Sequence, residues 1–278
     1  MIVITGATGK LGSLVVKHLL PLVPANQIRL AVRDPSKVSD LISQGVQIGE
    51  GDYSNSGFTK TLEGCDKLFL VSAPVFGDKC INLHRQAIDA AKQAGVGCIY
   101  YTSHVGASHQ SLLKDHSVTH DLLDESGIKS VILRNGFYSD NLVKFGKPGD
   151  IRVPRDGKVS WTTRDDLAKA TAVLLSQAIP EEAKPEHVFL TNSTSIDYDG
   201  VAQILTRMGK PSTRTVISDE EFVEELKKGG TPAAYAGFFA AMFAASAKGD
   251  YSKVDGKLEE LIGGKAKTME EILRGGLV

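Results

Sequence analysis

The chain lacks the features that mark several common classes of protein: it has no excess of charge, few cysteines and no long hydrophobic run. Its 32 basic and 33 acidic residues leave a formal net charge of −1, so no basic excess exists to hold a nucleic acid through its phosphates. The three cysteines, widely spaced and odd in number, fit reduced thiols in a cytosol better than a disulfide framework or a zinc site. We expect a cytoplasmic protein that does not bind nucleic acid.

The sequence also shows no pattern that predicts a membrane-spanning helix or a signal peptide. An apolar strand is expected from Ile2, which leaves no room for the charged first part of a signal peptide. The most apolar later stretch, residues 233–247, is too short to cross a membrane and is interrupted by Tyr235, Gly237 and Ser246. With 42% hydrophobic and 23% charged residues, the composition is that of a globular protein with a sizeable core.

Short apolar runs alternate with helical patterns in the first half of the chain, which is typical of βαβ units and a parallel sheet. The expected strands cover residues 2–5, 28–32, 46–49, 68–72, 98–102 and 130–134. The expected helices cover residues 10–20, 81–94 and 111–126, the last with a C-cap at Gly127. The predicted fold is therefore α/β, a doubly wound parallel sheet of the Rossmann type.

The pattern changes beyond Asn135. Later segments predict helices over 164–177, 197–208 and 219–228 and a strand over 187–190. Ser218 and Glu221 predict a capping box at the start of the last of these helices. We divide the chain into a dinucleotide-binding domain, residues 1–140, and a smaller, mainly helical lobe, residues 141–278, with one strand and one helix returning to the main sheet.

A glycine-rich loop between the first strand and the first helix is the most informative motif. Gly6 permits the tight turn, Gly9 lets the backbone approach a pyrophosphate, and Gly12 lets the helix pack closely on the sheet. The helix N-terminus offers free N–H groups to the phosphates. The loop therefore predicts a dinucleotide site, and its candidate binding residues are Gly6, Thr8, Gly9, Lys10, Leu11 and Gly12.

The residues after the second expected strand indicate which dinucleotide is bound. An acidic residue there would accept a hydrogen bond from a ribose 2′-hydroxyl, but this chain has Arg33. A guanidinium binds a 2′-phosphate with two hydrogen bonds and stacks on adenine, and Lys37 adds a second positive charge. Asp34, directly before Pro35, is expected in a turn or cap. The sequence predicts NADPH rather than NADH as the cofactor.

Further motifs carry a family resemblance, which runs nearly end to end and weakens over residues 205–250. They are Gly51-Asp52-Tyr53, Leu62-Glu63-Gly64-Cys65-Asp66-Lys67-Leu68-Phe69-Leu70 and Leu133-Arg134-Asn135-Gly136-Phe137-Tyr138-Ser139-Asp140-Asn141. With the G-x-x-G-x-x-G spacing of the glycine loop, they resemble the NmrA-like family of atypical short-chain dehydrogenases/reductases, in its branch of quinone and triphenylmethane reductases. The resemblance implies that Asp52 lies at the adenine end, although its spacing equally fits a turn aspartate.

Polar and small residues end the fourth and fifth expected strands. Ligands of open α/β sheets bind at the carboxyl edge of the strands, so these residues should line the ribose and nicotinamide part of the site. They are Ser72, Ala73, Pro74, Thr102 and Ser103.

The helix over residues 111–126 lacks the Tyr-x-x-x-Lys pair with which short-chain dehydrogenases reduce carbonyls. Aligned on the helix end, His116 replaces the lysine and Leu112 the tyrosine. An acceptor that is already electrophilic needs little acid assistance, so reduction stays open. His116, which would also contact the cofactor, and Tyr138 are the candidate catalytic residues. Each has an equally good structural interpretation, as a hydrogen-bonded cleft histidine and a packed core tyrosine.

Aromatic residues flank the strand ends and predict a pocket for a small, planar, hydrophobic substrate. The candidates are Phe76, His104, Phe137 and Tyr138. The apolar helix around residues 235–243 either roofs this pocket or lies in the lobe core or in a homodimer contact. His116 and His120 have the i, i+4 spacing of zinc ligands, but no third ligand is evident, so we expect no metal site.

Three classes of function remain, and the first is favoured. It is NADPH-dependent reduction of a conjugated electrophile such as a quinone, imine, dye or enone. The second is a non-catalytic NADP(H) sensor, because the NmrA-like family also contains regulators and the missing pair of residues fits one. The third is an epimerase or isomerase, which is disfavoured because such relatives keep the tyrosine and lysine.

Overall fold

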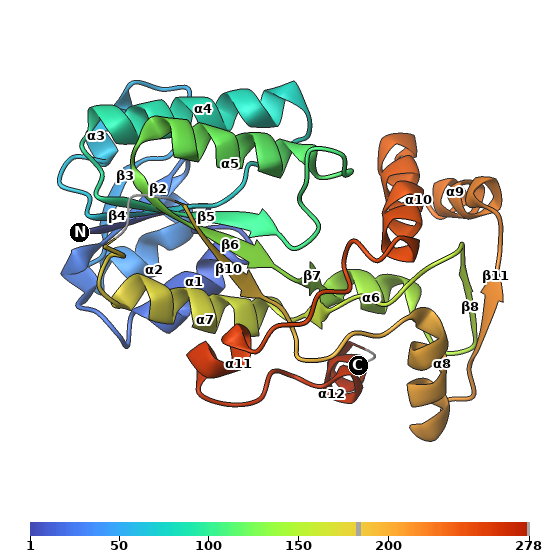
Figure 1. The fold of residues 1–278 in the computed structure, drawn as a ribbon. Coiled ribbons are helices and arrows are strands. Elements are labelled where there is room, and N and C mark those ends of the chain that lie inside the picture. The colour runs from blue at the N-terminus through green and yellow to red at the C-terminus, as the bar shows by residue number, and fades with distance from the viewer. Residues whose placement is uncertain (182–184, 277–278) are drawn as a thin grey trace.

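The computed structural model describes residues 1–181 and 185–276. Its central sheet has seven parallel strands in the order β10-β6-β5-β4-β1-β2-β3 (Figure 1). They are β1 (Ile2–Thr5), β2 (Ile28–Val32), β3 (Gln47–Glu50), β4 (Lys67–Leu70), β5 (Cys98–His104), β6 (Lys129–Asn135) and β10 (Glu186–Leu190). The chain reverses direction across the sheet between β1 and β4, which makes that point the crevice where ligands bind in such folds. The predicted Rossmann fold is confirmed.

Helices cover both faces of the sheet, because its strands are apolar on both sides. One face carries α1 (Gly12–Leu19), α2 (Ser39–Ile42), α7 (Arg164–Ser176) and α11 (Lys257–Ile262) (Figure 1). The other carries α3 (Gly57–Thr61), α4 (Asp78–Gln93) and α5 (Lys114–Ser126). Short 3-10 turns, Ala25–Gln27 and Pro35–Val38, flank β2. The second half of the chain thus supplies α7 and the edge strand β10 to the main layers.

The remaining elements form a lobe at the carboxyl end of the strands (Figure 1). They are β7 (Phe137–Tyr138), α6 (Ser139–Phe145), β8 (Asp150–Val153), β9 (Trp161–Thr162), α8 (Tyr198–Arg207), β11 (Thr213–Val216), α9 (Asp219–Lys228), α10 (Ala233–Ala247) and α12 (Met269–Gly276). β7 pairs with β9 and β8 pairs with β11, both in parallel. An aromatic core that includes Trp161, Phe243 and Tyr251 holds the lobe together.

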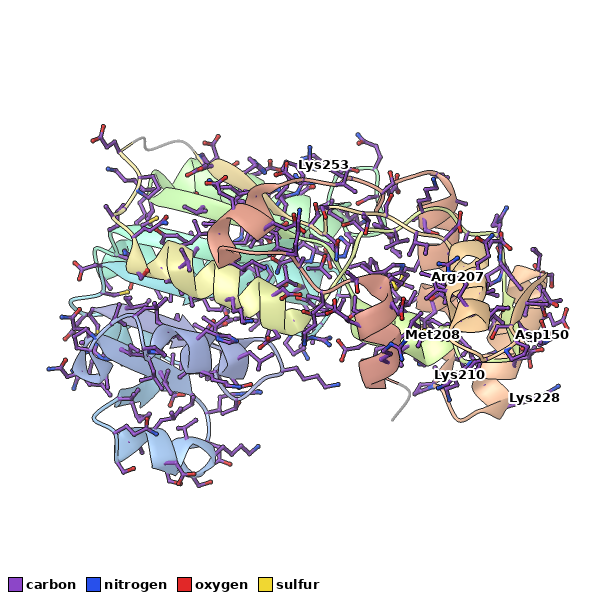
Figure 2. The ribbon with its side chains drawn as sticks, turned by 90° about the horizontal axis from the view of Figure 1, so that it is seen from below. Asp150, Arg207, Met208, Lys210, Lys228 and Lys253 are labelled. Atoms are coloured by element: carbon purple, nitrogen blue, oxygen red, sulfur yellow. The ribbon has the colours of Figure 1, made fainter. Side chains whose placement is uncertain are left out.

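The far end of the lobe is polar and remote from the sheet. Lys210 and Lys228 lie at the end of the molecule opposite the Rossmann sheet (Figure 2). Among the described residues, no helix has the length and apolar character needed to cross a membrane.

Two predictions at helix starts were wrong in part, because side-chain hydrogen bonds formed there with other partners. Helix α5 begins at Lys114 rather than at residue 111, because Ser111 Oγ accepts from the backbone N–H groups of Ser108 and Leu113 and so stabilises a turn. Ser218 caps α9 by accepting from the backbone N–H of Glu221, but the reciprocal half of the predicted capping box is absent. The carboxylate of Glu221 binds Arg152 instead, at 2.5 Å. By contrast, Gly127 ends α5 at a φ of 72°, as predicted.

Candidate functional site

The glycine loop brings backbone and helix closer together than any side chain would allow. Gly6 has a φ of 62° and its carbonyl accepts from Gly9 N–H at 2.8 Å. A Cβ on Gly12 would lie 2.2 Å from Gly6 O, so only glycine fits where α1 starts. Gly6 therefore makes the predicted tight turn and Gly12 the predicted close packing, and the N-terminus of α1 faces the carboxyl edge of the sheet.

A cavity of about 420 Å³ opens beside this loop, at the crevice between β1 and β4. It brings together eight of the predicted cofactor residues. They are Gly6, Thr8, Gly9, Arg33, Asp52, Ser72, Ala73 and Pro74. Lys79 and Tyr53 also line it but are missing from the sequence prediction. Tyr53 directly follows Asp52, whereas Lys79 opens a helix with no motif to mark it.

The other predicted cofactor residues lie around this cavity rather than on its wall. Lys10 is exposed on the loop, Leu11 and Gly12 are buried beneath it, and Lys37 lines a neighbouring cavity with Thr8. Thr102 and Ser103 are buried under the cleft. Thr102 Oγ1 accepts from the backbone N–H of Ser72 at 2.8 Å, and Ser103 Oγ lies 2.7 Å from His120 Nε2. Thr102 therefore supports the cavity wall from below.

Two aspartates beside Arg33 adopt turns. Asp34 caps the following 3-10 turn by accepting from Ser36 N–H at 3.1 Å, as predicted. Asp52 accepts from the backbone and the hydroxyl of Ser54. These bonds, helped by the charge of Arg33, hold the pKa of the Asp52 carboxyl below its usual range. Asp52 thus makes a turn and also lines the cavity, which is compatible with both interpretations of its sequence position.

The segment after β4, residues 71–77, forms one wall of the cavity and is fastened to α4 and α5. The backbone N–H of Ala73 donates to Nε2 of the fully buried His84 at 2.9 Å. The backbone N–H of Gly77 donates to Asp115 Oδ2 at 2.6 Å. Burial lowers the pKa of His84 to about 4, so the imidazole is a neutral acceptor at neutral pH.

His116, the candidate catalytic residue, lies one position beyond Asp115 on α5. Its Nδ1 is 2.8 Å from the hydroxyl of Tyr101 on β5. Burial, helped by the positive charge of Arg134, lowers the pKa of His116 to about 4. His120 turns to Ser103 instead. Among the described residues, no three His, Cys, Asp or Glu side chains gather as a metal site would require.

Arg134, near the end of β6, anchors the loop that follows β5. Arg134 donates to the carbonyl oxygens of His104, Val105 and Ala107 at 3.0, 2.9 and 2.8 Å. His104, a candidate substrate residue, is thereby held with its ring 4.9 Å from that of Phe137. Burial lowers the pKa of His104 to about 3. Arg134 therefore fastens the end of β5 and the loop after it, and neither Arg134 nor His104 lines the cavity.

The other candidates, which follow β6, differ in exposure. Phe137 is buried in the lobe core, with its ring 5.5 Å from that of Trp161. Tyr138 is half-buried, and the guanidinium of Arg164 lies over its ring at 4.2 Å. Burial raises the pKa of the Tyr138 phenol. At neutral pH this hydroxyl is protonated and can donate a hydrogen bond.

The lobe reaches the cleft through α10. The ring of Phe238 on this helix stacks on Phe76, which extends from the cavity wall. Other residues of α10, including Phe243, pack in the lobe core. The helix therefore lies in the lobe core, as one of the sequence interpretations expected, and it touches the segment after β4 through Phe238.

The strand order, the glycine loop and the adjoining crevice define the Rossmann class of α/β proteins. Within that class the chain belongs to the NmrA-like family, whose model matches residues 1–273. It is 36% identical to quinone oxidoreductase 2 of Escherichia coli over 280 residues, which span 98% of this chain and 96% of that protein.

Two solved structures of enzymes with bound cofactor resemble the whole chain. The NADPH complex of the NADPH-dependent quinone oxidoreductase QOR2 of Escherichia coli matches with a TM-score of 0.90 and 33% identity over 99% of both chains. The NADP(H) complex of the triphenylmethane reductase of Citrobacter sp. matches with a TM-score of 0.89 and 32% identity, again over 99% of both chains. The predicted family is confirmed.

Proposed function

We propose that this protein is an NADPH-dependent reductase of conjugated electrophiles such as quinones, imines, cationic dyes or enones. The observation that carries the proposal is the cavity in which the glycine loop and the exposed Arg33 meet. Its whole-length similarity to a quinone reductase and a dye reductase, both solved with this cofactor, supports the same assignment.

The residues of the cavity fit NADPH by their chemistry. The free N–H groups at the start of α1 suit a pyrophosphate, and the glycines leave room for it beside the backbone. Arg33 suits a 2′-phosphate because a guanidinium presents two parallel donors. Lys79, on the same cavity, adds a positive charge. When bound, the cofactor supplies a hydride.

At the other end of the cleft, the side chains favour an acceptor that needs little protonation. Leu112, in the place of the usual tyrosine, lies outside α5 and is 38% exposed. His116 is neutral at pH 7, so it can donate a hydrogen bond but is a poor source of protons. Phe76 and Phe238 offer aromatic faces to a flat molecule. Quinones and conjugated cations combine flatness with electrophilicity, which is why they are the proposed acceptors.

The test is NADPH consumption, followed by its absorbance, against a panel of quinones, conjugated imines, triarylmethane dyes and enones. Binding of NADPH and NADH is titrated on the same sample. Turnover with one class of acceptor supports a reductase and identifies that class. Tight NADPH binding without oxidation by any member of the panel would overturn the proposal in favour of a dinucleotide sensor.

A further inference from the structure

A chain of hydrogen bonds beneath the cleft determines which nitrogen of His84 carries its proton. Nε2 must accept, because its partner is the backbone N–H of Ala73. The proton of the neutral ring is therefore on Nδ1, which lies 2.8 Å from Thr119 Oγ1. The Thr119 hydroxyl in turn donates to the carbonyl of Asp115 at 2.8 Å. The donors and acceptors of this chain are thus fully assigned.

The same reasoning extends to Tyr101, whose side chain is fully buried. Its hydroxyl lies 2.8 Å from Nδ1 of His116. Burial raises the pKa of this phenol, and the nearby hydroxyls of Ser72 and Thr119 oppose that rise only in part. The hydroxyl proton of Thr119 is already directed to Asp115. A buried phenol is a stronger donor than acceptor, so Tyr101 donates to Nδ1. His116 must then carry its proton on Nε2.

The hydrogen bond between Tyr101 and His116 leaves the second ring nitrogen, Nε2, available for another partner. Among the described residues it makes no hydrogen bond, and it is absent from the fully buried atoms that lack a partner, so it keeps some accessible surface although the ring is largely buried. Asp115, its neighbour on α5, holds Gly77 at the end of the cavity wall. Burial and the charge of Arg134 favour the neutral form of the His116 ring by lowering its pKa. His116 in turn helps to lower the pKa values of His84, His104 and His120.

We propose that Tyr101 is a positioning residue that keeps His116 in the Nε2–H tautomer, so that a neutral imidazole N–H donates to an oxygen of the bound acceptor. This inference rests on the proposed function and assigns the proton in its site. A carbonyl oxygen of a quinone gains negative charge as the quinone is reduced, so a fixed donor there stabilises the transition state more than the ground state.

The test compares Tyr101→Phe with Tyr100→Phe in the full chain. Tyr100 is the neighbouring buried tyrosine and faces the opposite side of β5, which makes it the matched control. Nitrogen NMR of the imidazoles reports the His116 tautomer directly, without turnover. We expect Nε2–H in the wild type and in Tyr100→Phe, and a mixture of tautomers in Tyr101→Phe.

Kinetics with a quinone supply the second readout. For Tyr101→Phe we expect kcat to fall about tenfold, the effect of one hydrogen bond, with NADPH affinity unchanged. His116→Gln should retain more activity than His116→Asn, because the longer amide can place an N–H near the position of Nε2. A wild-type His116 in the Nδ1–H form, or an unchanged tautomer in Tyr101→Phe, would overturn the inference. If none of the acceptors in the panel oxidised NADPH in the presence of the wild type, the proposed function would be refuted instead.

Discussion

The ring of Phe76 stacks on the ring of Phe238, with centroids 5.0 Å apart and planes inclined by 33°. Phe76 belongs to the wall after β4 and Phe238 to α10, so this pair joins the sheet domain to the lobe across the cleft. Phe76 is nevertheless 57% exposed, which leaves ring surface for a ligand. We expect Phe76→Ala and Phe238→Ala to raise KM for a planar quinone by up to about tenfold, because each removes an aromatic contact.

Steady-state kinetics give KM for the quinone and an NADPH titration gives the cofactor affinity, and together they test this prediction. NADPH affinity should stay unchanged in both variants, since neither ring lines the cofactor cavity. Tyr235→Ala, at an exposed position of the same helix, is the control and should leave KM unaltered. An equal rise of KM in that control would mean that α10 had shifted as a whole.

Arg33 should decide between the two nicotinamide cofactors. Its side chain is exposed at the cavity that also holds Asp52. Arg33→Ala should weaken NADPH binding by about 10- to 100-fold, the range for a hydrogen-bonded charge, and leave NADH binding nearly unchanged. Fluorescence titration of both cofactors measures the ratio. Equal losses for NADPH and NADH would show that Arg33 does not contact the 2′-phosphate.

Lys37 offers a comparison within the same turn. It lines the neighbouring cavity, and its Nζ lies 3.9 Å from Asp34. We expect Lys37→Ala to weaken NADPH binding less than about threefold, as for a solvent-screened charge. A loss as large as that of Arg33→Ala would place Lys37 at the phosphate, as the sequence alone predicts.

The fold could be predicted because its signals are local. The buried strands are short apolar runs, as in β1 and β2, whose observed bounds equal the expected ones. Within a few residues, the glycine loop combines a tight turn at Gly6, the start of α1, and a close approach between Gly12 and the carbonyl of Gly6. Where a prediction was wrong, as at the start of α5, a side-chain hydrogen bond of Ser111 competed with the helix.

The supports of the site could not be predicted in this way, because their partners are distant in sequence. His84 and Thr119 are 35 positions apart, Gly77 and Asp115 are 38 apart, and Tyr101 and His116 are 15 apart. Only the packing of α4 and α5 on the sheet brings them together. A single sequence makes His116 a candidate through its place in a known pattern, but it contains no sign of Tyr101, whose hydroxyl contacts the His116 ring.

Gly12 and Gly237 have opposite surroundings, one crowded and one open, so substituting each tests how closely α1 approaches the glycine loop. A Cβ at Gly12 would lie 2.2 Å from the carbonyl oxygen of Gly6, whereas a Cβ at Gly237 in α10 would meet nothing within 4 Å. Gly12→Ala should cost about 1 to 3 kcal/mol of unfolding free energy, as overpacking does. It should also abolish NADPH binding, since the loop must move.

Gly237→Ala is the matched control for that substitution. It should raise the unfolding free energy by about 0.5 to 1 kcal/mol, because alanine is the better helix former. Urea unfolding of both variants measures the pair. Two variants of equal stability would contradict the close approach between α1 and the glycine loop.

The buried imidazole of His84 makes the stability of the protein depend on pH. Its folded-state pKa is lowered by burial from 6.5 to about 4. In the unfolded chain the ring regains its ordinary pKa, so between these two values the unfolded state binds a proton that the folded state does not. The contribution of His84 is therefore fully present above pH 6.5 and is lost as the pH falls toward 4.

We expect the free energy of unfolding to fall over this window, with a share of roughly 3 kcal/mol from His84. His104, His116 and His120 add to the slope because burial lowers their pKa values in the same direction. Urea unfolding at a series of pH values measures this dependence.

His84→Gln should flatten the plot of unfolding free energy against pH in part, since an amide can still accept from Ala73 N–H but does not titrate. An unaltered slope in His84→Gln would mean that His84 does not titrate in this window, and that the wall after β4 does not depend on its neutral form.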